Sequence, residues 1–292
     1  HNNMKTVLMH FRTAWSDYFP GTATLLQNNE YRERRTPSGT GVYITNCLFI
    51  SITSSSDGGA LYCSNSVTYF LVESSSFLSC KTSGSYGAIY FYHGSGQSVL
   101  HEVCGFDCSA NSNYHFEWIH VNDAISKKNY INYSSISRCE DSDRWHLFGL
   151  HSGKICFPSV NVSLNKCSGR SVFYFPFADS NSVTCSLSYS SFVDNIATGY
   201  TCVCFHRSGA KYEIKSCNIL RNTQDSLSSE GTIATWGNLK IEDSCILENK
   251  ATNIFYSSSS YSITLSNCTV DSTSNNGYLT TQNTVTKSFI LA

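Results

Sequence analysis

The chain has 292 residues, of which 41% are hydrophobic and 14% are charged, so it can bury one long core. Its 20 basic and 21 acidic residues leave a formal net charge of -1. Because so even a balance creates no field that attracts nucleic acid or an acidic membrane, we expect no nucleic-acid partner. The chain has no apolar run near the roughly 18 residues of a membrane span and no signal-peptide core, so we expect no transmembrane segment in it.

Residues 1–40 differ in composition from the rest of the chain. The stretch from Thr22 to Arg35 contains Leu25-Leu26 and three arginines, and it precedes the turn Pro37-Ser38-Gly39. We expect residues 1–40 to form a helical or irregular cap over the first turn of the domain that follows.

From Gly41 nearly to the C-terminus, a short motif built on Ser or Cys, an apolar residue and a Cys or Asn returns about every 27 or 28 residues. Its central residues are Phe49, Phe77, Gly105, Ile136, Leu164, Phe192, Ile219, Ile246 and Thr269. The successive differences between these numbers are 28, 28, 31, 28, 28, 27, 27 and 23. A period in this range is typical of a solenoid.

Around each motif, apolar and polar residues alternate, as in Tyr212-Glu213-Ile214-Lys215 and Leu239-Lys240-Ile241-Glu242. A period of two indicates strands, and neither the 3.6 spacing of helical repeats nor a leucine-rich signature is found. We therefore predict an all-β, right-handed parallel β-helix over residues 41–292. About nine coils, stacked at about 4.8 Å each, would form a rod of about 43 Å.

The 14 cysteines do not form the paired doublets of a zinc site, so we expect no metal. Three positions after the motif centres, the repeat predicts one inward-pointing ladder in which Asn amides bond one another and Cys acts as a small hydrophobe. The ladder residues are Cys80, Cys108, Cys139, Cys167, Asn195, Asn222 and Asn249. Alternatively, disulfides in a secreted protein could join some coils, since one coil spacing suits the Cα separation of a bridge.

Charged side chains support the register of the later coils. With Ile219 aligned on Ile246, the pairs Glu213–Lys240, Lys215–Glu242, Arg221–Glu248 and Asp194–Arg221 all match opposite signs. Parallel in-register strands place such positions side by side, where opposite charges attract. We interpret them as a solvated structural face.

Three Asn-x-Ser/Thr sequences, at Asn132, Asn161 and Asn267, are candidate N-glycosylation sites. In a chain this rich in Asn, Ser and Thr, such sequences also arise by chance. At least two of them fall where the repeat predicts strands.

The acidic residues do not indicate a catalytic site. The β-helix enzymes, pectate lyases and polygalacturonases, gather acids with Arg or Lys from adjacent coils in one cleft. Here the acids share no column: Glu73, Glu102, Asp107, Glu117, Asp123, Asp141, Asp143 and Glu230. The nearest cluster, Asp141-Ser142-Asp143-Arg144 beside His146 and His151, is interpreted as a solvated turn. We expect no catalytic residue and no cofactor.

An outward column of aromatic residues is the candidate binding face. In the strands of the Gly-Ala-x-Tyr type, alternation predicts that Leu61, Ile89, Ile119, Phe173 and Val203 point inward. Their neighbours would then point outward as Tyr62, Tyr90, His120 and Tyr174, a column that could include Trp236 and Phe255. A flat aromatic column can stack on sugar rings or bind a partner protein. Alternatively, the tyrosines simply favour strands.

Short motifs resemble those of known surface proteins. Gly58-Gly59-Ala60-Leu61, Tyr86-Gly87-Ala88-Ile89 and Phe192-Val193-Asp194-Asn195 are similar to the Gly-Gly-Ala-apolar and Phe-x-x-Asn repeats of the chlamydial polymorphic outer-membrane proteins. Residues 41–292 more closely resemble a large trichomonad family of Ser- and Cys-rich β-helix surface proteins. Both resemblances imply cell-surface display, the chlamydial one implies adhesion, and neither carries catalytic residues. The chain departs from both patterns in having one full Gly-Gly-Ala motif and no membrane helix.

Together these features predict a non-catalytic structural or adhesive rod, secreted or at the cell surface, with any anchor outside this chain. Its partner would be a host or matrix protein or a glycan, bound through an outer sheet face. The first alternative is a carbohydrate-active or carbohydrate-binding protein, which requires acids that converge beside the aromatic column. The second alternative is an intracellular scaffold with reduced thiols.

Overall fold

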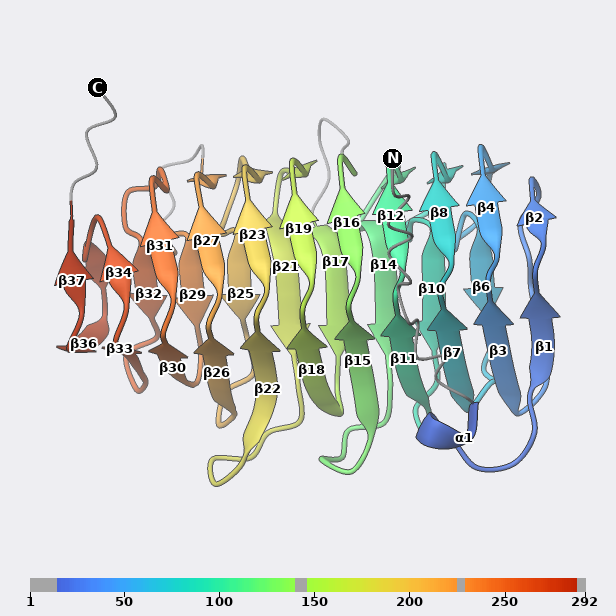
Figure 1. The fold of residues 1–292 in the computed structure, drawn as a ribbon, viewed down its shortest axis with the longest axis horizontal. Helices are drawn as coiled ribbons and strands as arrows, with labels where there is room; N and C mark the ends of the chain where they lie inside the picture. The colour runs from blue at the N-terminus through green and yellow to red at the C-terminus, as the bar shows by residue number, and fades with distance from the viewer. Residues whose placement is uncertain (1–14, 140–145, 225–228, 288–292) are drawn as a thin grey trace, which may run out of the picture.

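The chain winds through three long parallel β-sheets that run side by side along one axis (Figure 1). The structure is a computed structural model, and it describes residues 15–139, 146–224 and 229–287. Nine successive coils contribute one strand to each of the three sheets, from β3, β4 and β6 to β33, β34 and β35. This confirms the all-β parallel solenoid. Its right-handed winding stays a prediction, based on the strong preference of parallel strand connections for that hand.

The strands of the three long sheets follow one another in chain order. Sheet A contains β1 (Thr24–Gln27), β3 (Gly41–Thr45), β7 (Tyr69–Glu73), β11 (Gln97–His101), β15 (Lys128–Asn132), β18 (Lys154–Pro158), β22 (Val183–Ser188), β26 (Lys211–Lys215), β30 (Asn238–Glu242), β33 (Ser262–Ser266) and β36 (Tyr278–Gln282). Sheet B contains β2 (Glu30–Tyr31), β4 (Leu48–Ile50), β8 (Ser76–Leu78), β12 (Cys104–Phe106), β16 (Ser135–Ser137), β19 (Asn161–Ser163), β23 (Ser191–Val193), β27 (Asn218–Leu220), β31 (Cys245–Leu247), β34 (Thr269–Val270) and β37 (Val285–Thr286). Sheet C contains β6 (Leu61–Cys63), β10 (Ile89–Tyr92), β14 (Tyr114–His120), β17 (His146–His151), β21 (Arg170–Phe175), β25 (Val203–Phe205), β29 (Ile233–Thr235), β32 (Phe255–Ser257) and β35 (Asn275–Asn276).

Two short sheets of three strands each lie in the segment of the coil between sheets B and C. One contains β5 (Thr53–Ser54), β9 (Lys81–Thr82) and β13 (Ser109–Ala110). The other contains β20 (Lys166–Cys167), β24 (Ile196–Ala197) and β28 (Thr223–Gln224). In the described residues the single helix is α1 (Trp15–Tyr18), and no helix there is long and apolar enough to cross a membrane.

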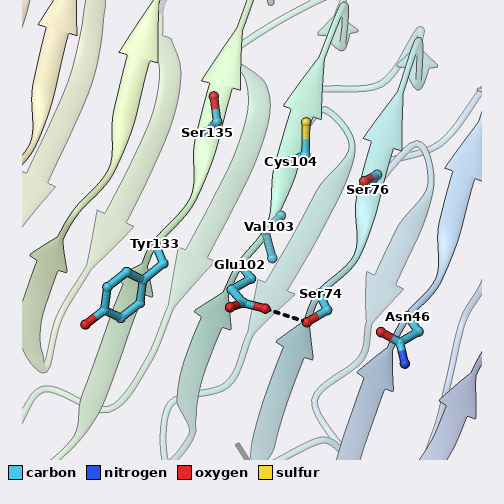
Figure 2. Close-up of a pocket in the computed structure, with 8 residues that line it drawn as sticks. All are labelled: Asn46, Ser74, Ser76, Glu102, Val103, Cys104, Tyr133 and Ser135. Carbon is cyan, nitrogen blue, oxygen red and sulfur yellow. Dashed lines mark hydrogen bonds between the residues drawn. The ribbon is translucent and has the colours of Figure 1, made fainter. Parts of the chain in front are cut away.

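Single left-handed residues turn the chain at both ends of sheet B. At the corner between sheets A and B these include Asn46, Ser74, Glu102 and Tyr133, with φ between 44° and 53°. A non-glycine residue in this region costs about 1–2 kcal/mol, but here its N–H continues the hydrogen-bond ladder, as from Ser74 N to His101 O at 3.0 Å. The side chains of these four residues point outward and border a groove along the corner (Figure 2).

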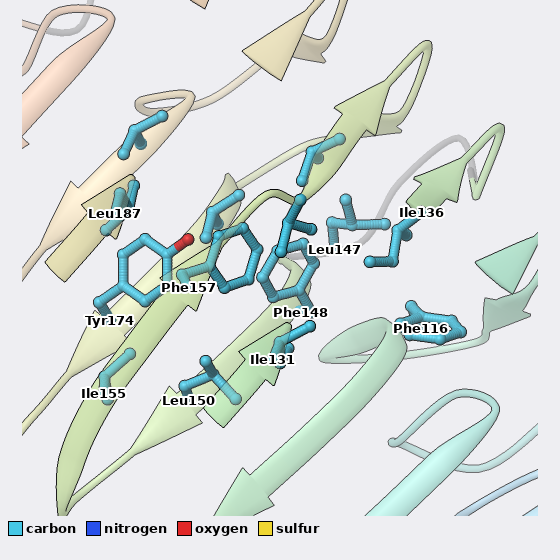
Figure 3. Packing of buried hydrophobic residues seen from close by; sticks show 14 of the residues in the cluster. Phe116, Ile131, Ile136, Leu147, Phe148, Leu150, Ile155, Phe157, Tyr174 and Leu187 are labelled. Atoms are coloured by element: carbon cyan, nitrogen blue, oxygen red, sulfur yellow. The ribbon is translucent and has the colours of Figure 1, made fainter. Parts of the chain in front are cut away.

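Apolar side chains from all three sheets fill the inside of the solenoid. Identical positions of successive coils stack, so the rings of Phe49 and Phe77 lie parallel with centroids 4.7 Å apart. In the central coils, Tyr174 contacts Phe157 inside the core (Figure 3). Each large apolar side chain that is fully buried contributes roughly 1.5–3 kcal/mol, so the many buried phenylalanines make this core the main stabilising feature.

The predicted inward ladder is present, with one correction. Asn165, not Cys167, follows Cys139: Asn165 Oδ1 accepts from Cys139 N at 2.9 Å, and Asn165 Nδ2 donates to Asn195 Oδ1 at 3.0 Å. The file continues through Asn222 and Asn249, whose amide contact is also 3.0 Å. Cys167 lies two residues further along, in β20, where it pairs with Ala197.

The cysteines and asparagines of this file play the same part. Cys80 Sγ and Cys108 Sγ lie 3.5 and 3.4 Å from the carbonyl oxygens of Phe49 and Phe77. Asn195 Nδ2 donates to the corresponding carbonyl, that of Val162, at 2.9 Å. All 14 cysteines are free thiols in the structure, and the thiols of this file lie as packed donors in the core.

The charge matches are confirmed where the structure tests them. Glu213 pairs with Lys240 and Lys215 with Glu242 in the register of β26 and β30. Arg221 forms a bidentate contact with Asp194, at 2.8 and 2.9 Å. These groups are exposed or half-buried, and exposed pairs of this kind each contribute little.

The described part of the N-terminal segment differs from the expected cap. Its strands β1 and β2 pair in parallel with β3 and β4, so residues 24–31 already belong to the solenoid and the boundary at residue 41 falls inside it. Helix α1 lies against the outer face of sheet A instead of covering the first coil. There Trp15 and the buried Phe19 pack on residues of β3, β7, β11 and β15, because this part of the sheet presents Tyr43, Leu71 and Val99 outward.

Candidate binding face

A continuous chain of aromatic ring contacts runs along the outer face of sheet C. It crosses eight consecutive coils, with successive centroids 5.0, 5.3, 5.6, 5.2, 5.4, 4.6 and 5.3 Å apart. We call these residues the aromatic chain: Tyr62, Tyr90, Trp118, His151, Phe173, His206, Trp236 and Tyr256. It zigzags between two outward files that are two residues apart on each strand, because alternate residues of a strand share a face.

At the Tyr62 end of the chain the rings turn their faces toward one another, whereas the contacts from Trp118 to Tyr256 are tilted by 41° to 56°. Tyr62 and Tyr90 are parallel to within 3°, and Tyr92 is parallel to Trp118 to within 5° at 5.5 Å. Since the strands of neighbouring coils are also about 4.8 Å apart, rings stacked along the axis leave mainly their edges and hydroxyl groups toward solvent. Burial among these rings raises the pKa of Tyr90 to about 12.

The structure brings only part of the predicted column together. Tyr62 and Tyr90 stack as expected, while His120 lies on the same face in the neighbouring file, beside Tyr92 and His151. The prediction that Tyr174 points outward is wrong. Tyr174 is fully buried in the core, and Phe173 takes the outward position. Trp236 is outward as expected, whereas Phe255 is fully buried.

The errors arise where the segment between sheets B and C changes length. Ile89 pairs with Glu117 and not with Ile119, and β14 carries an irregularity between Tyr114 and Glu117. A shift of one residue moves every side chain of a strand to the opposite face. The sequence analysis therefore missed Trp118, His151, Phe173, His206 and Tyr256, although aromatic residues two apart, such as Phe173 and Phe175, signal an outward pair of files.

Histidines and one arginine form the middle of the face. His151 Nε2 lies 3.2 Å from the Tyr114 hydroxyl, and His146 Nδ1 accepts from the Arg170 backbone N–H at 3.0 Å. Burial, with repulsion from neighbouring cationic groups, lowers the pKa of His146 and of His151 to about 3. At neutral pH both imidazoles are uncharged parts of an aromatic surface.

The Arg170 guanidinium lies over this surface. It is 5.4 Å from the centroid of Phe173, 5.0 Å from that of Tyr200 and 5.9 Å from that of Trp236. Glu230 pairs with it at 3.4 Å. Arg34 lies 4.7 Å over the ring of Tyr62, so a cation lies over the aromatic chain at its first residue and again near Phe173 and Trp236.

The acidic residues within the described part of the chain remain apart. Glu230 pairs with Arg170, Asp123 with Arg207 and Asp107 with Lys81. Glu73 is buried and accepts from the Tyr43 hydroxyl, while Glu102 lies at the corner groove. The cluster at Asp141 and Asp143 falls outside the described residues.

Glu117 is the acidic residue with the most unusual environment. It is fully buried, in the inward file of Ile89 and Phe148. Burial raises the pKa of its carboxyl well above the ordinary value, so the group is held neutral in an apolar core, where no substrate reaches it. Across residues 15–139, 146–224 and 229–287, no three His, Cys, Asp or Glu side chains are arranged to hold a metal ion.

The three candidate glycosylation residues differ in access. Asn132 is buried at the end of β15, whereas Asn161 and Asn267 are exposed. A glycan is bulky and needs a surface position, so the folded chain offers Asn161 and Asn267 for modification.

Comparison of the chain with protein-family models, with curated proteins and with solved structures gave no match. The function is therefore argued from the geometry of the chain itself.

Proposed function

We propose that this protein is a non-catalytic adhesive rod that binds a protein ligand through the outer face of sheet C. The observation that carries this proposal is the aromatic chain, which is continuous over eight coils and accompanied by arginines. Tyr, Trp and Arg dominate the energetics of protein interfaces. A stack of rings built on a rigid sheet also loses little conformational entropy on binding.

At the Tyr62 end of the aromatic chain, the orientation of the rings favours a protein over a sugar. Sugar binding by stacking needs an open ring face, but in the pairs Tyr62–Tyr90 and Tyr92–Trp118 the faces are parallel and directed at each other. Ring edges and tyrosine hydroxyl groups remain, and these suit apolar side chains and backbone acceptors of a protein ligand.

Two further parts of the proposal, the lack of catalysis and the display outside the cell, rest on separate observations. Among the described residues, Asp107, Glu230 and Asp123 each pair with a different basic residue. This separation supports a role without polysaccharide cleavage, since lyase and hydrolase chemistry needs converging charges. Display at a cell surface or secretion rests on the Gly-Gly-Ala and Phe-x-x-Asn motifs. Protease treatment of intact native cells tests it, and loss of the protein is the expected result.

Binding of the purified chain to a panel of immobilised matrix proteins tests the proposed face. Replacing Tyr62, Tyr90 and Trp118 by Ser should weaken binding by about 1 kcal/mol or more per residue. The matched control replaces the exposed aromatic residues Phe106, Tyr189 and Tyr278 by Ser. Equal binding by the two triple variants, both folded by circular dichroism, would exclude the face. Release of reducing ends or unsaturated products from pectic polymers would contradict the non-catalytic role.

Carbohydrate binding is a second candidate function, which a different surface favours. The corner groove between sheets A and B combines an exposed tyrosine with a carboxylate and hydroxyl groups. An intracellular scaffold remains the third reading, and thiol counting on protein from its native source separates it, since extracellular passage would oxidise accessible pairs.

A further inference from the structure

The groove at the corner of sheets A and B has a volume of about 590 Å³, which lies within the usual range for small-molecule sites. On one side it is bordered by the left-handed corner residues of four successive coils, Asn46, Ser74, Glu102 and Tyr133. The other side is the outer face of β8, β12 and β16. Adjacent positions there hold Ser76, Cys104 and Ser135, and such small side chains leave the hollow open.

Tyr133 forms an apolar wall of the groove. It is 60% exposed, although its ring meets the edge of the His101 ring at 5.4 Å and 74°. His101 Nδ1 lies in turn 3.4 Å from the hydroxyl of Tyr18. The Tyr133 ring is thus supported on one side, and most of its surface is open to a ligand, unlike the rings of the aromatic chain.

Polar groups line the same groove as this ring. The Glu102 carboxylate accepts a hydrogen bond from Ser74 Oγ at 2.7 Å, which orients it within the groove (Figure 2). A carboxylate offers several acceptor positions and bonds hydroxyl groups strongly. Asn46 and the serines add groups that both donate and accept. None of the eight lining residues is basic.

We propose that this groove binds a neutral oligosaccharide. A sugar ring would lie against Tyr133, with its C–H groups toward the aromatic face and its hydroxyl groups donating to Glu102. Four coils contribute along the groove, which gives a length of about 14 Å at about 4.8 Å per step and suits a short chain of sugars more than one unit. An acidic sugar would bring its charge toward the Glu102 carboxylate, which repels it, so we expect the groove to prefer neutral sugars to uronic acids.

Isothermal titration of the full chain with neutral gluco-, galacto-, manno- and xylo-oligosaccharides, and with oligogalacturonate as the acidic probe, tests this site. We expect at least one neutral ligand to bind and oligogalacturonate not to bind. Tyr133→Ala and Glu102→Gln should each weaken binding about tenfold or more, the effect of losing a stacking surface or a charged hydrogen bond.

The chain supplies matched controls. Tyr189 is 68% exposed at the same corner position, outside the groove, and Asp243 is an acid at that position. Tyr189→Ala and Asp243→Asn should leave sugar binding unchanged. Ser135→Trp, which fills the hollow from sheet B, should abolish binding even if Tyr133→Ala proves unstable.

Three results would overturn the site. They are binding of no neutral oligosaccharide at millimolar concentration, sugar binding that survives Glu102→Gln and Ser135→Trp, and a preference for the acidic probe. The test is independent of the proposed protein-binding face, because groove variants should retain the protein ligand, and variants of Tyr62, Tyr90 and Trp118 should retain the sugar.

Discussion

The inner amide file, formed by Asn165, Asn195, Asn222 and Asn249, can be compared with the aromatic chain on the outside of sheet C. Both repeat one kind of side chain from coil to coil. In the amide file each Asn after Asn165 accepts from the backbone N–H and the side-chain amide of the Asn in the preceding coil, as Asn222 does from Asn195 at 3.1 and 3.0 Å. The aromatic chain is held by ring contacts at 4.6 to 5.6 Å, without a directional bond in each step.

The difference separates the part of the fold that fixes register from the part that is open to function. A directional amide bond in a dry interior is lost if a coil slips by one residue, and an unsatisfied group there is costly. Ring contacts tolerate changes of angle and identity, so Tyr, Trp, His and Phe can follow one another along the outside. Four predictions break or sharpen this comparison, beginning with the largest expected effect.

Asn195→Ala should lower the free energy of unfolding by about 3 kcal/mol, measured by chemical denaturation. The change removes the bond to Val162 O and leaves the Asn165 N–H and amide without their acceptor. Asn161→Ala is the control in a neighbouring exposed position, and it should cost no more than about 0.5 kcal/mol. Equal costs for the two variants would mean that the amide file does not hold the register.

Acid should destabilise the outer face before it affects the amide file. His146 and His151 have a pKa of about 3 in the folded chain and about 6.5 when unfolded. The unfolded state therefore binds more protons between these values, and stability should fall as pH drops from about 6.5 toward 3, by on the order of 2 kcal/mol for each histidine by pH 4.5. The His146→Gln, His151→Gln double variant should flatten this dependence, and an unchanged pH profile would contradict the assignment.

Exchanging the two residue types of the inward ladder tests whether thiol and amide are equivalent. Asn222→Cys should cost about 1–2 kcal/mol, because a thiol cannot accept as Asn222 Oδ1 does from Asn195. Cys108→Asn should either leave the free energy of unfolding unchanged or raise it by up to about 1 kcal/mol, since an amide there can donate to Phe77 O, as the thiol does. A large loss from Cys108→Asn would show that packing, and not hydrogen bonding, selects cysteine in the early coils.

The errors of the sequence analysis have physical causes. The pairing of Ile136 with Val162, and of Val162 with Phe192, makes one coil 26 residues long and the next 30. The two lengths add up to two regular periods of 28, so the motif at Leu164 to Cys167 still fitted the repeat and the shift of two residues went unnoticed. The coils around Glu213 and Lys240 have constant length and were aligned correctly. Likewise, the phase of alternation in sheet C restarts after each variable turn, which is why Tyr62 and Tyr90 were predicted and Tyr174 was not.

Nothing in the sequence repeat predicted the corner groove. Its lining residues Glu102 and Tyr133 occupy corner positions where any side chain points outward, because the left-handed backbone and not the side chain makes the turn. Residue identity at such positions is free to vary with function. The hollow itself depends on three small residues in neighbouring strands, Ser76, Cys104 and Ser135, which only a correct register places side by side.

The smallest effect we expect is the coupling between rings of the aromatic chain. In a double-mutant cycle of Tyr62→Leu and Tyr90→Leu, leucine keeps apolar area on the sheet while removing the ring contact at 5.0 Å. The coupling energy should be about 1 kcal/mol. The same cycle on Asn195→Ala and Asn222→Ala should give a larger value, because buried hydrogen bonds link these two residues directly. A ring coupling as large as the amide coupling would break the comparison, since the outer face would then be as constrained as the interior and could not vary to suit a ligand. A coupling near zero would mean that the rings are neighbours by chance. The tyrosines would then be present only because they favour strands.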